Sequence, residues 1–197
     1  MSYHLAEYWN ERYTKDTEPF EWYQKWKDLK PLLGNLVCKE SRVLVLGCGS
    51  SNLSFDLYDE GVKSIDSIDI SQVVVNQLND RKGDRNMNFY VRDSTDMGET
   101  PDATYDIIID KATIDSLLCG EGARQKVNDT LSHCSRILKA GGSLISISYA
   151  QPDMRLLFFD QEGYKWTVES KSIEKPKLLE SSASVPDHHY IYIMKRS

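Results

Sequence analysis

The feature that most constrains this chain is an apolar run that ends in a glycine turn. Residues 43–46 read Val-Leu-Val-Leu, and Gly47-Cys48-Gly49 and a polar Ser-Ser-Asn follow. Four consecutive apolar residues are typical of a strand buried on both faces of a parallel sheet. Because glycine lacks a Cβ, the backbone can turn sharply there and a ligand can lie against it. The stretch therefore predicts a strand, a tight turn and a helix start, which together form a nucleotide-type binding edge.

The third glycine of a dinucleotide fingerprint is missing from this turn. It would stand at position 52, where the chain has Asn52. In dinucleotide-binding folds that glycine lets the helix pack closely on the sheet beside a pyrophosphate. Its replacement disfavours NAD and FAD and favours an adenosine ligand without a diphosphate, of which S-adenosylmethionine is the foremost candidate. A structural turn that binds no ligand is the alternative for this motif taken alone.

Composition narrows the class of protein and its partners. The chain has 197 residues, and we expect residues 1–197 to form one α/β domain. Its formal net charge of -6 argues against a nucleic-acid partner and suits a basic protein substrate. The four cysteines lack metal-ligand spacing, so we expect no metal site and a reduced, intracellular setting. With no signal peptide or membrane-spanning run visible, a cytoplasmic monomer without membrane contacts is expected.

The first 34 residues are rich in aromatic residues, and we expect residues 1–34 to form a helical lid. Tyr8, Trp9 and Tyr13 have helical spacing, and a second helix is predicted over residues 21–33. An aromatic face attracts a cation such as a sulfonium by about 0.5–2 kcal/mol. We therefore expect two or three of these rings to line a cofactor pocket, while the others pack the segment onto the sheet.

Acidic residues follow three successive predicted strands. The second strand ends at Asp69, roughly 20 residues past the glycines, where an acid accepts the hydroxyl groups of an adenosine ribose. Asp93 follows the third strand, and its carboxylate is placed to accept an adenine amino group, although a turn residue is the alternative. Asp110 follows the fourth strand. Because the carboxyl ends of parallel strands meet at one edge of a sheet, the three acids are expected to lie along one ligand site.

The remaining pattern completes an α/β fold. An amphipathic helix is predicted over 121–138, a fifth strand over 143–149 and a further helix over 151–160. Two final strands, about 164–170 and 189–195, are expected to pair as an antiparallel hairpin. The predicted fold is a Rossmann-like three-layer sandwich with a seven-stranded, mostly parallel sheet and this C-terminal hairpin.

Five segments carry a resemblance to a known family. They are Glu7-Tyr8-Trp9-x-x-Arg12-Tyr13, Phe20-Glu21-Trp22-Tyr23, the glycine turn with its strand, Ser67-Ile68-Asp69-Ile70-Ser71 with the valines that follow, and Asp110-Lys111-Ala112-Thr113-Ile114-Asp115-Ser116-Leu117-Leu118. In these segments the chain resembles the class I, seven-stranded S-adenosylmethionine-dependent methyltransferases. More narrowly, it resembles the elongation factor 1-alpha lysine methyltransferases. The segments occur in order over nearly the whole chain, and the aromatic segments and the last one are the most specific.

The resemblance implies a protein-lysine N-methyltransferase that uses S-adenosylmethionine and acts on a translation elongation factor. Together with Gly49 of the turn, it implies the following cofactor-binding residues: Trp9, Tyr13, Trp22, Gly47, Asp69, Ile70, Asp93, Ser94 and Lys111. Lys111 is expected to pair with a cofactor carboxylate or to cap backbone groups at the pocket floor. Family members usually have Glu-Lys-Gly where this chain has Asp110-Lys111-Ala112, and the shorter acid alters how a target amine is held.

Lysine methylation requires the target amine to lose its proton, because the pKa of free lysine lies near 10.4. We hypothesise that Asp110 is the catalytic residue that orients the incoming amine. Two alternatives stay open: a methyltransferase for a small molecule, and an adaptor that binds S-adenosylmethionine without turnover. An NAD-dependent oxidoreductase is a third, disfavoured by Asn52 and by the lack of a Tyr-x-x-x-Lys-type catalytic pair.

Overall fold

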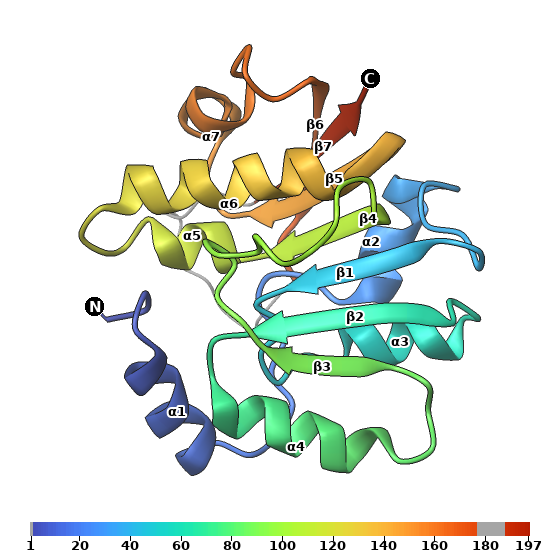
Figure 1. Ribbon diagram of the computed structural model, residues 1–197, viewed down its shortest axis with the longest axis vertical. Coiled ribbons are helices and arrows are strands. Elements are labelled where there is room, and N and C mark those ends of the chain that lie inside the picture. Colours follow the sequence, from blue (N-terminus) through green and yellow to red (C-terminus); the bar gives the residue numbers. More distant parts are fainter. Residues whose placement is uncertain (1, 177–187) are drawn as a thin grey trace.

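A seven-stranded sheet organises the molecule (Figure 1). The computed structural model describes residues 2–176 and 188–197. The strands are β1 (Arg42–Leu46), β2 (Ser64–Asp69), β3 (Asn88–Val91), β4 (Tyr105–Lys111), β5 (Leu138–Ser148), β6 (Trp166–Glu174) and β7 (His188–Arg196). Their order in the sheet is β3-β2-β1-β4-β5-β7-β6. Strands β1 to β5 run parallel, whereas β7 pairs antiparallel with both β5 and β6, so the predicted hairpin and sheet class are confirmed.

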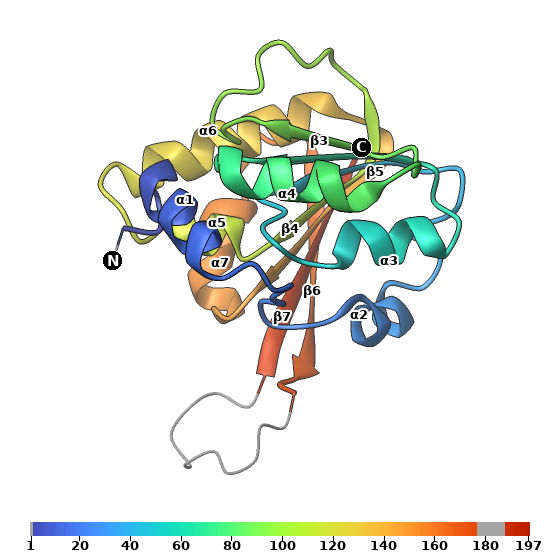
Figure 2. The ribbon, with the colours of Figure 1, turned by 90° about the horizontal axis from the view of Figure 1, so that it is seen from below.

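Helices cover both faces of this sheet, as Figures 1 and 2 show together. The helices of the described residues are α1 (Ala6–Lys15), α2 (Trp26–Leu33), α3 (Leu53–Asp59), α4 (Gln72–Lys82), α5 (Thr113–Leu117), α6 (Ala123–Ile137) and α7 (Pro152–Phe159). Ser71 caps the beginning of helix α4, because its side chain accepts a hydrogen bond from the Val74 amide. Helix α1 packs on α4, where the Gln77 amide group donates to the Tyr13 carbonyl.

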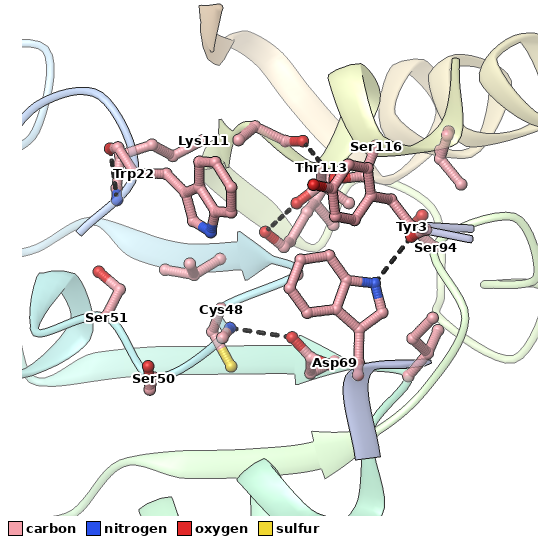
Figure 3. A pocket seen from close by; sticks show the side chains of 18 of the residues that line it. Tyr3, Trp22, Cys48, Ser50, Ser51, Asp69, Ser94, Lys111, Thr113 and Ser116 are labelled. Carbon is pink, nitrogen blue, oxygen red and sulfur yellow. Dashed lines mark hydrogen bonds between the residues drawn. The ribbon is translucent and has the colours of Figure 1, made fainter. Parts of the chain in front are cut away.

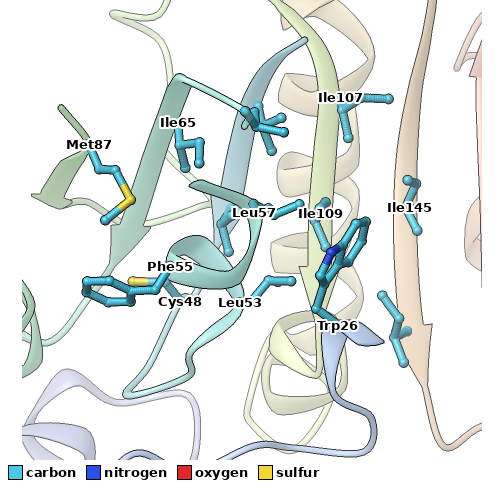
Figure 4. Packing of buried hydrophobic residues seen from close by; sticks show 14 of the residues in the cluster. Trp26, Cys48, Leu53, Phe55, Leu57, Ile65, Met87, Ile107, Ile109 and Ile145 are labelled. Atoms are coloured by element: carbon cyan, nitrogen blue, oxygen red, sulfur yellow. The ribbon is translucent and has the colours of Figure 1, made fainter. Parts of the chain in front are cut away.

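Alternate residues of the central strands pack into two separate cores. In β1, Val43 and Val45 belong to the core shared with helices α1 to α4, while Leu44 and Leu46 belong to the core shared with α5, α6 and α7. All four side chains are at most 2% exposed. Figure 4 shows the first core, in which Trp26 of α2 lies beside Ile109 of β4. The unbroken apolar run therefore reflects a strand covered by helices on both sides.

The predicted second helix was wrong at its beginning, because α2 starts at Trp26 and not at residue 21. Residues 21–25 instead cross the carboxyl ends of the strands. The Glu21 carboxylate accepts hydrogen bonds from Ser51 and Asn52 at the start of α3, and Tyr23 has a left-handed backbone with φ +62°. These long-range contacts override the local helical pattern of the segment.

The fifth strand is longer than predicted, because two glycines form a bulge within it. Tyr105 of β4 pairs with Leu138, and after a register shift Ile107 pairs with Ser143. A Cβ on Gly142 would approach the Asp106 carbonyl to 2.8 Å, so the backbones meet closely at this point. Gly141 and Gly142, which stand between the predicted helix over 121–138 and the predicted strand over 143–149, therefore lie inside β5.

Some polar and thiol side chains of the central elements are also buried. Asp66 points away from the glycine turn, because its carboxylate accepts hydrogen bonds from Tyr105 and Asn88. Cys48 and Cys134 are buried. Within the part of the chain that the structure describes, no helix combines the length and apolar character that a membrane crossing would require.

Candidate functional site

The turn after β1 requires glycine at positions 47 and 49. Gly47 and Gly49 have φ angles of +51° and +49°, a region that residues with a Cβ rarely adopt. A Cβ on Gly47 would lie 2.2 Å from the Thr113 Oγ1, and one on Gly49 would lie 2.8 Å from the Tyr13 hydroxyl oxygen. The Thr113 hydroxyl is fixed there because it donates to the Leu46 carbonyl at 2.9 Å. The turn is thus packed between residues 2–34, called the N-terminal segment below, and α5.

A pocket opens at this turn, along the carboxyl ends of β1, β2, β3 and β4 (Figure 3). It encloses about 1020 Å³ of empty space, part of which is open to solvent. Every cofactor-binding residue predicted from the sequence lines it: Trp9, Tyr13, Trp22, Gly47, Gly49, Asp69, Ile70, Asp93, Ser94 and Lys111. Residues from the N-terminal segment and from the carboxyl ends of β1, β2, β3 and β4 are therefore brought together at one edge of the sheet.

Asp69 ties the end of β2 to the turn. Its Oδ2 accepts a hydrogen bond from the Gly49 amide and its Oδ1 accepts one from the Ser71 amide, both at 2.9 Å. The side chain lines the pocket although the residue is only 6% exposed. Burial raises the pKa of Asp69 to about 6, while the backbone hydrogen bonds from Ser71 and Gly49 act in the opposite direction.

The pair after β3 is held by local hydrogen bonds. The Asp93 Oδ1 accepts from the amide and the hydroxyl of Thr95, both at 2.8 Å, so the turn interpretation also describes this residue. Ser94 is buried, with its hydroxyl 3.3 Å from the Thr130 hydroxyl on α6. Both residues nevertheless face the pocket.

Aromatic rings of the N-terminal segment form one wall of the pocket. The indole of Trp9 donates to the Tyr3 carbonyl at 2.7 Å and stacks on the Tyr13 ring with the centroids 5.6 Å apart. Trp22 meets Phe20 edge to face at 5.2 Å. Burial raises the pKa of Tyr13, so its hydroxyl stays protonated beside Gly49. The wall therefore presents apolar ring surface to any ligand in the pocket.

Lys111 lies in the pocket wall with its ammonium group already engaged. It donates to the Glu21 carboxylate at 2.9 Å and to the Trp22 carbonyl at 3.1 Å. The Lys111 side chain is 5% exposed and that of Glu21 is 13% exposed, so the ion pair is nearly buried. Burial lowers the pKa of Lys111, and the Glu21 charge opposes this shift. Glu21 thus joins the N-terminal segment to β4 and to the start of α3.

Asp110 stands behind the pocket and is not among the described residues that line it. Its Oδ1 accepts hydrogen bonds from the Thr113 amide at 2.9 Å and the Ile114 amide at 3.1 Å. Its Oδ2 accepts from the Ser146 hydroxyl at 2.5 Å. Burial raises the pKa of this carboxyl group to about 6. Asp110 therefore caps the first turn of α5, and its contact with a target amine stays a prediction.

A second buried carboxylate, Asp115 on α5, was not singled out by sequence reasoning. It accepts from the Tyr23 hydroxyl and the Ser148 hydroxyl, each at 2.7 Å, and forms an ion pair with Arg155 of α7. It thereby connects the N-terminal segment, α5, the end of β5 and α7. Asp115 belongs to one of the quoted family segments, but its partners lie too far away in the sequence to be foreseen.

Arg12, Thr113 and Ser116 also line the pocket without having been selected. A signal for Arg12 was present, since it stands between Trp9 and Tyr13 in the first family segment. Its guanidinium carbon lies 5.4–5.7 Å from the centroids of three aromatic rings.

Metal ligation is not indicated by the arrangement of the described residues. Within them, no group of three or more His, Cys, Asp or Glu side chains is placed to hold an ion. His188 and His189 are neighbours on β7, and the first is exposed while the second is buried. Their side chains therefore lie on opposite faces of the strand, as its alternation predicts.

Comparison with known proteins agrees with this geometry. A family model described as a methyltransferase domain matches residues 38–187. The chain is 33% identical over 199 residues to the eEF1A lysine and N-terminal methyltransferase of Bos taurus, a match that spans 97% of the chain and 28% of that protein. It is 31% identical over 207 residues to EEF1A lysine methyltransferase 4 of Mus musculus, spanning 100% of the chain and 77% of that protein. The chain thus spans less than a third of the first relative's length.

Solved structures share the fold. An S-adenosylmethionine-dependent methyltransferase from Methanosarcina mazei superposes with a TM-score of 0.65 at 15% identity, over 86% of this chain and 98% of that one. The N-methyltransferase NodS from Bradyrhizobium japonicum, in complex with S-adenosyl-L-homocysteine, gives a TM-score of 0.58 at 14% identity, over 78% and 76%. On the family match, the relatives and the sheet order, this chain belongs to the class I S-adenosylmethionine-dependent methyltransferases.

Proposed function

We propose that this chain is a protein-lysine N-methyltransferase that uses S-adenosylmethionine and acts on translation elongation factor 1A. The observation that carries the proposal is the pocket, in which the glycine turn, the buried Asp69 carboxylate and the rings of the N-terminal segment share one space. The acceptor class is supported by the relatives, whose names refer to lysine methylation of eEF1A.

The residues of the pocket fit an adenosine that carries a sulfonium group. The backbone of Gly47 and Gly49 lines the pocket, so a ligand there can lie directly against the main chain of the turn. Asp69 offers a carboxylate at the strand end where ribose hydroxyl groups are bound in this fold class. The rings of Trp9 and Trp22 offer the faces that attract a cation. When bound, the cofactor supplies an electrophilic methyl group on a positively charged sulfur.

The chain's own contribution is alignment and exclusion of water. Rings from the N-terminal segment cover the turn, and a covered site lowers the pKa of a target lysine, because desolvation disfavours the ammonium form. Holding the neutral amine in line with the methyl group contributes several kcal/mol to lowering the barrier. In this proposal Asp110 acts on the amine through α5, whose first amides it holds and whose Ser116 lines the pocket.

Incubation with labelled S-adenosylmethionine and purified elongation factor 1A tests the proposal. We expect label on the factor, and digestion followed by mass spectrometry should place a mass increase of methyl groups on one lysine. The Asp69→Ala variant is the control and should label the factor at least tenfold more slowly. A second incubation replaces the factor by a cell extract, and label found there only on small molecules would contradict the protein acceptor. Binding of S-adenosylmethionine without any methylated product would indicate an adaptor.

A separate variant tests the role given to Asp110. An asparagine side chain can accept the same amide hydrogen bonds but carries no charge, so Asp110→Asn should preserve the fold and the affinity for the cofactor. We expect its turnover to fall by about tenfold or more if the charge helps to hold the amine. Full turnover at unchanged cofactor affinity would contradict the catalytic role.

The setting of the activity is part of the same proposal. The acidic chain is expected to work as a monomer in the cytoplasm, with a basic protein surface as its partner and without nucleic acid or membrane contacts. Gel filtration with light scattering and fractionation of cells that express the tagged protein would test these points.

A further inference from the structure

The further inference concerns the anionic end of the cofactor and rests on the proposed function. The methionine part of S-adenosylmethionine carries a carboxylate, and a pocket that binds it needs a cationic or N–H-rich partner. Lys111 and the amides at the start of α3 are the partners that the fold class suggests. In this structure both are already occupied, since Glu21 accepts from Lys111 and from the Asn52 amide.

Arg12 is a cation of the pocket lining that, unlike Lys111, is not engaged by a carboxylate among the described residues. Its guanidinium carbon lies 5.7 Å from the Trp9 ring and 5.4 Å from each of the Phe20 and Trp22 rings. Within residues 2–176 and 188–197, the guanidinium group of Arg12 forms no hydrogen bond or ion pair. Three aromatic rings thus lie beside the guanidinium, while its N–H groups have no acceptor among these residues.

This arrangement suits a bidentate anion. A guanidinium presents its N–H groups in a planar fork that matches a carboxylate, and its attraction to nearby rings uses none of these N–H groups as hydrogen-bond donors. Arg12 lines the same pocket as the glycine turn, one helical turn from Trp9 and adjacent to Tyr13. We propose that Arg12 binds the carboxylate of the cofactor's methionine part, and that Lys111 is a positioning residue that holds Glu21.

Calorimetric titration with two ligands tests this assignment without relying on turnover. One ligand is S-adenosylhomocysteine and the other is its decarboxylated analogue, which lacks only the carboxylate. In Arg12→Met, which keeps an apolar stem against the rings, we expect S-adenosylhomocysteine to bind ~10- to 100-fold more weakly. The analogue should bind this variant within threefold of the wild-type chain. Arg12→Lys, which keeps the charge but loses the fork, should give an intermediate loss for S-adenosylhomocysteine.

Lys15→Met is the matched control, because Lys15 lies on the same helix as Arg12 but is exposed and outside the pocket lining, and the substitution removes the same charge. It should leave both affinities within threefold of wild type, and a selective loss of S-adenosylhomocysteine binding in this variant would overturn the assignment to Arg12. Equal weakening of both ligands in Arg12→Met, or of neither, would overturn it as well. A wild-type chain that binds neither ligand would instead refute the proposed function on which the assignment rests.

Discussion

At the scale of single residues, Gly47 is the position in the turn where substitution should be most costly. Its φ is +51°, and a Cβ there would lie 2.2 Å from the Thr113 Oγ1. Gly47→Ala therefore combines backbone strain with a clash, and we expect the free energy of unfolding to fall by ~2–4 kcal/mol. Gly122→Ala is the matched control, because Gly122 is in the left-handed helical region with φ +66° and ψ +17° but has open space around it. Its cost should be only ~1 kcal/mol. Urea unfolding measures both, and equal losses would contradict the clash.

Asp69 should make cofactor binding depend on pH. Its pKa is raised by burial to about 6, so the carboxylate that accepts ribose hydroxyl groups is ionised above pH 7 and protonated near pH 5. We expect the affinity for S-adenosylhomocysteine to fall about tenfold from pH 7.5 to pH 5. The unliganded fold responds in the opposite sense, since a raised acid pKa contributes stability at low pH that is lost as the pH rises through about 6. Calorimetric titration of wild type and Asp69→Asn with S-adenosylhomocysteine tests this role of Asp69, because the variant should bind the ligand weakly at both pH values. An equal pH dependence in the two proteins would contradict it.

The residues that sequence could assign are those whose position follows from a nearby strand end. Asp69 and Asp93 close predicted parallel strands, so the sheet edge that they share was foreseeable. Asp110 obeys the same rule, yet its carboxylate turns back to cap α5 and lies outside the pocket lining. A position at a strand end fixes the edge of the sheet, but the direction of a side chain depends on partners such as Ser146, which is 36 residues away.

At the scale of elements, residues 21–25 show where local pattern fails. Their sequence favours a helix, but Glu21 pairs with Lys111 across 90 residues and the segment extends over the pocket instead. Propensity differences of well under 1 kcal/mol per residue are outweighed here, because a helix over this segment would leave the nearly buried Lys111 ammonium group without its counter-charge. Such pairings are invisible in a single sequence, because nothing in the local pattern indicates which cation a glutamate will meet.

This ion pair should hold the N-terminal segment on the sheet. Glu21→Gln leaves the Lys111 ammonium group without its counter-charge at a site where the side chain is 5% exposed. We expect a loss of ~3–5 kcal/mol in the free energy of unfolding, and the double variant Glu21→Gln/Lys111→Met should recover much of it. Chemical denaturation measures both, and limited proteolysis should cut the single variant faster near residue 21. A double variant no more stable than the single one would show that the charge itself is not the cause.

At the scale of the whole molecule, the seven-stranded sheet with its C-terminal hairpin was predictable, and the unbroken apolar run of β1 predicted a strand buried on both faces. Leu44 and Val45 lie on opposite faces of β1, and each meets its own set of helices. The bulge at Gly142 escaped prediction, because a glycine pair after a helix is also a typical helix end. Glycine is needed at position 142 because the Asp106 carbonyl of β4 approaches closely, and this contact depends on how β4 and β5 pair.

A ligand that binds only the folded chain should raise its melting temperature. S-adenosylhomocysteine at 100 times its dissociation constant contributes ~2.7 kcal/mol, and a chain of this size gains ~2–4 °C per kcal/mol. We therefore expect a rise of about 5–10 °C in scanning calorimetry. NAD at the same concentration is the control and should give no rise, because Asn52 replaces the glycine of the dinucleotide turn. A shift with NAD alone would contradict the proposed cofactor.

The position of β7 has a consequence for biosynthesis. Residues 188–196 insert between β5 and β6, so β6 has no neighbour in the sheet until this later segment arrives. While the chain is emerging from the ribosome, the edge of β5 is unpaired and can form hydrogen bonds with a strand of another chain. Strand β6 likewise lacks its pairing partner until β7 has been synthesised. Completion of the sheet therefore waits for translation past Arg196, and nascent chains stalled earlier are the species that we expect chaperones to protect.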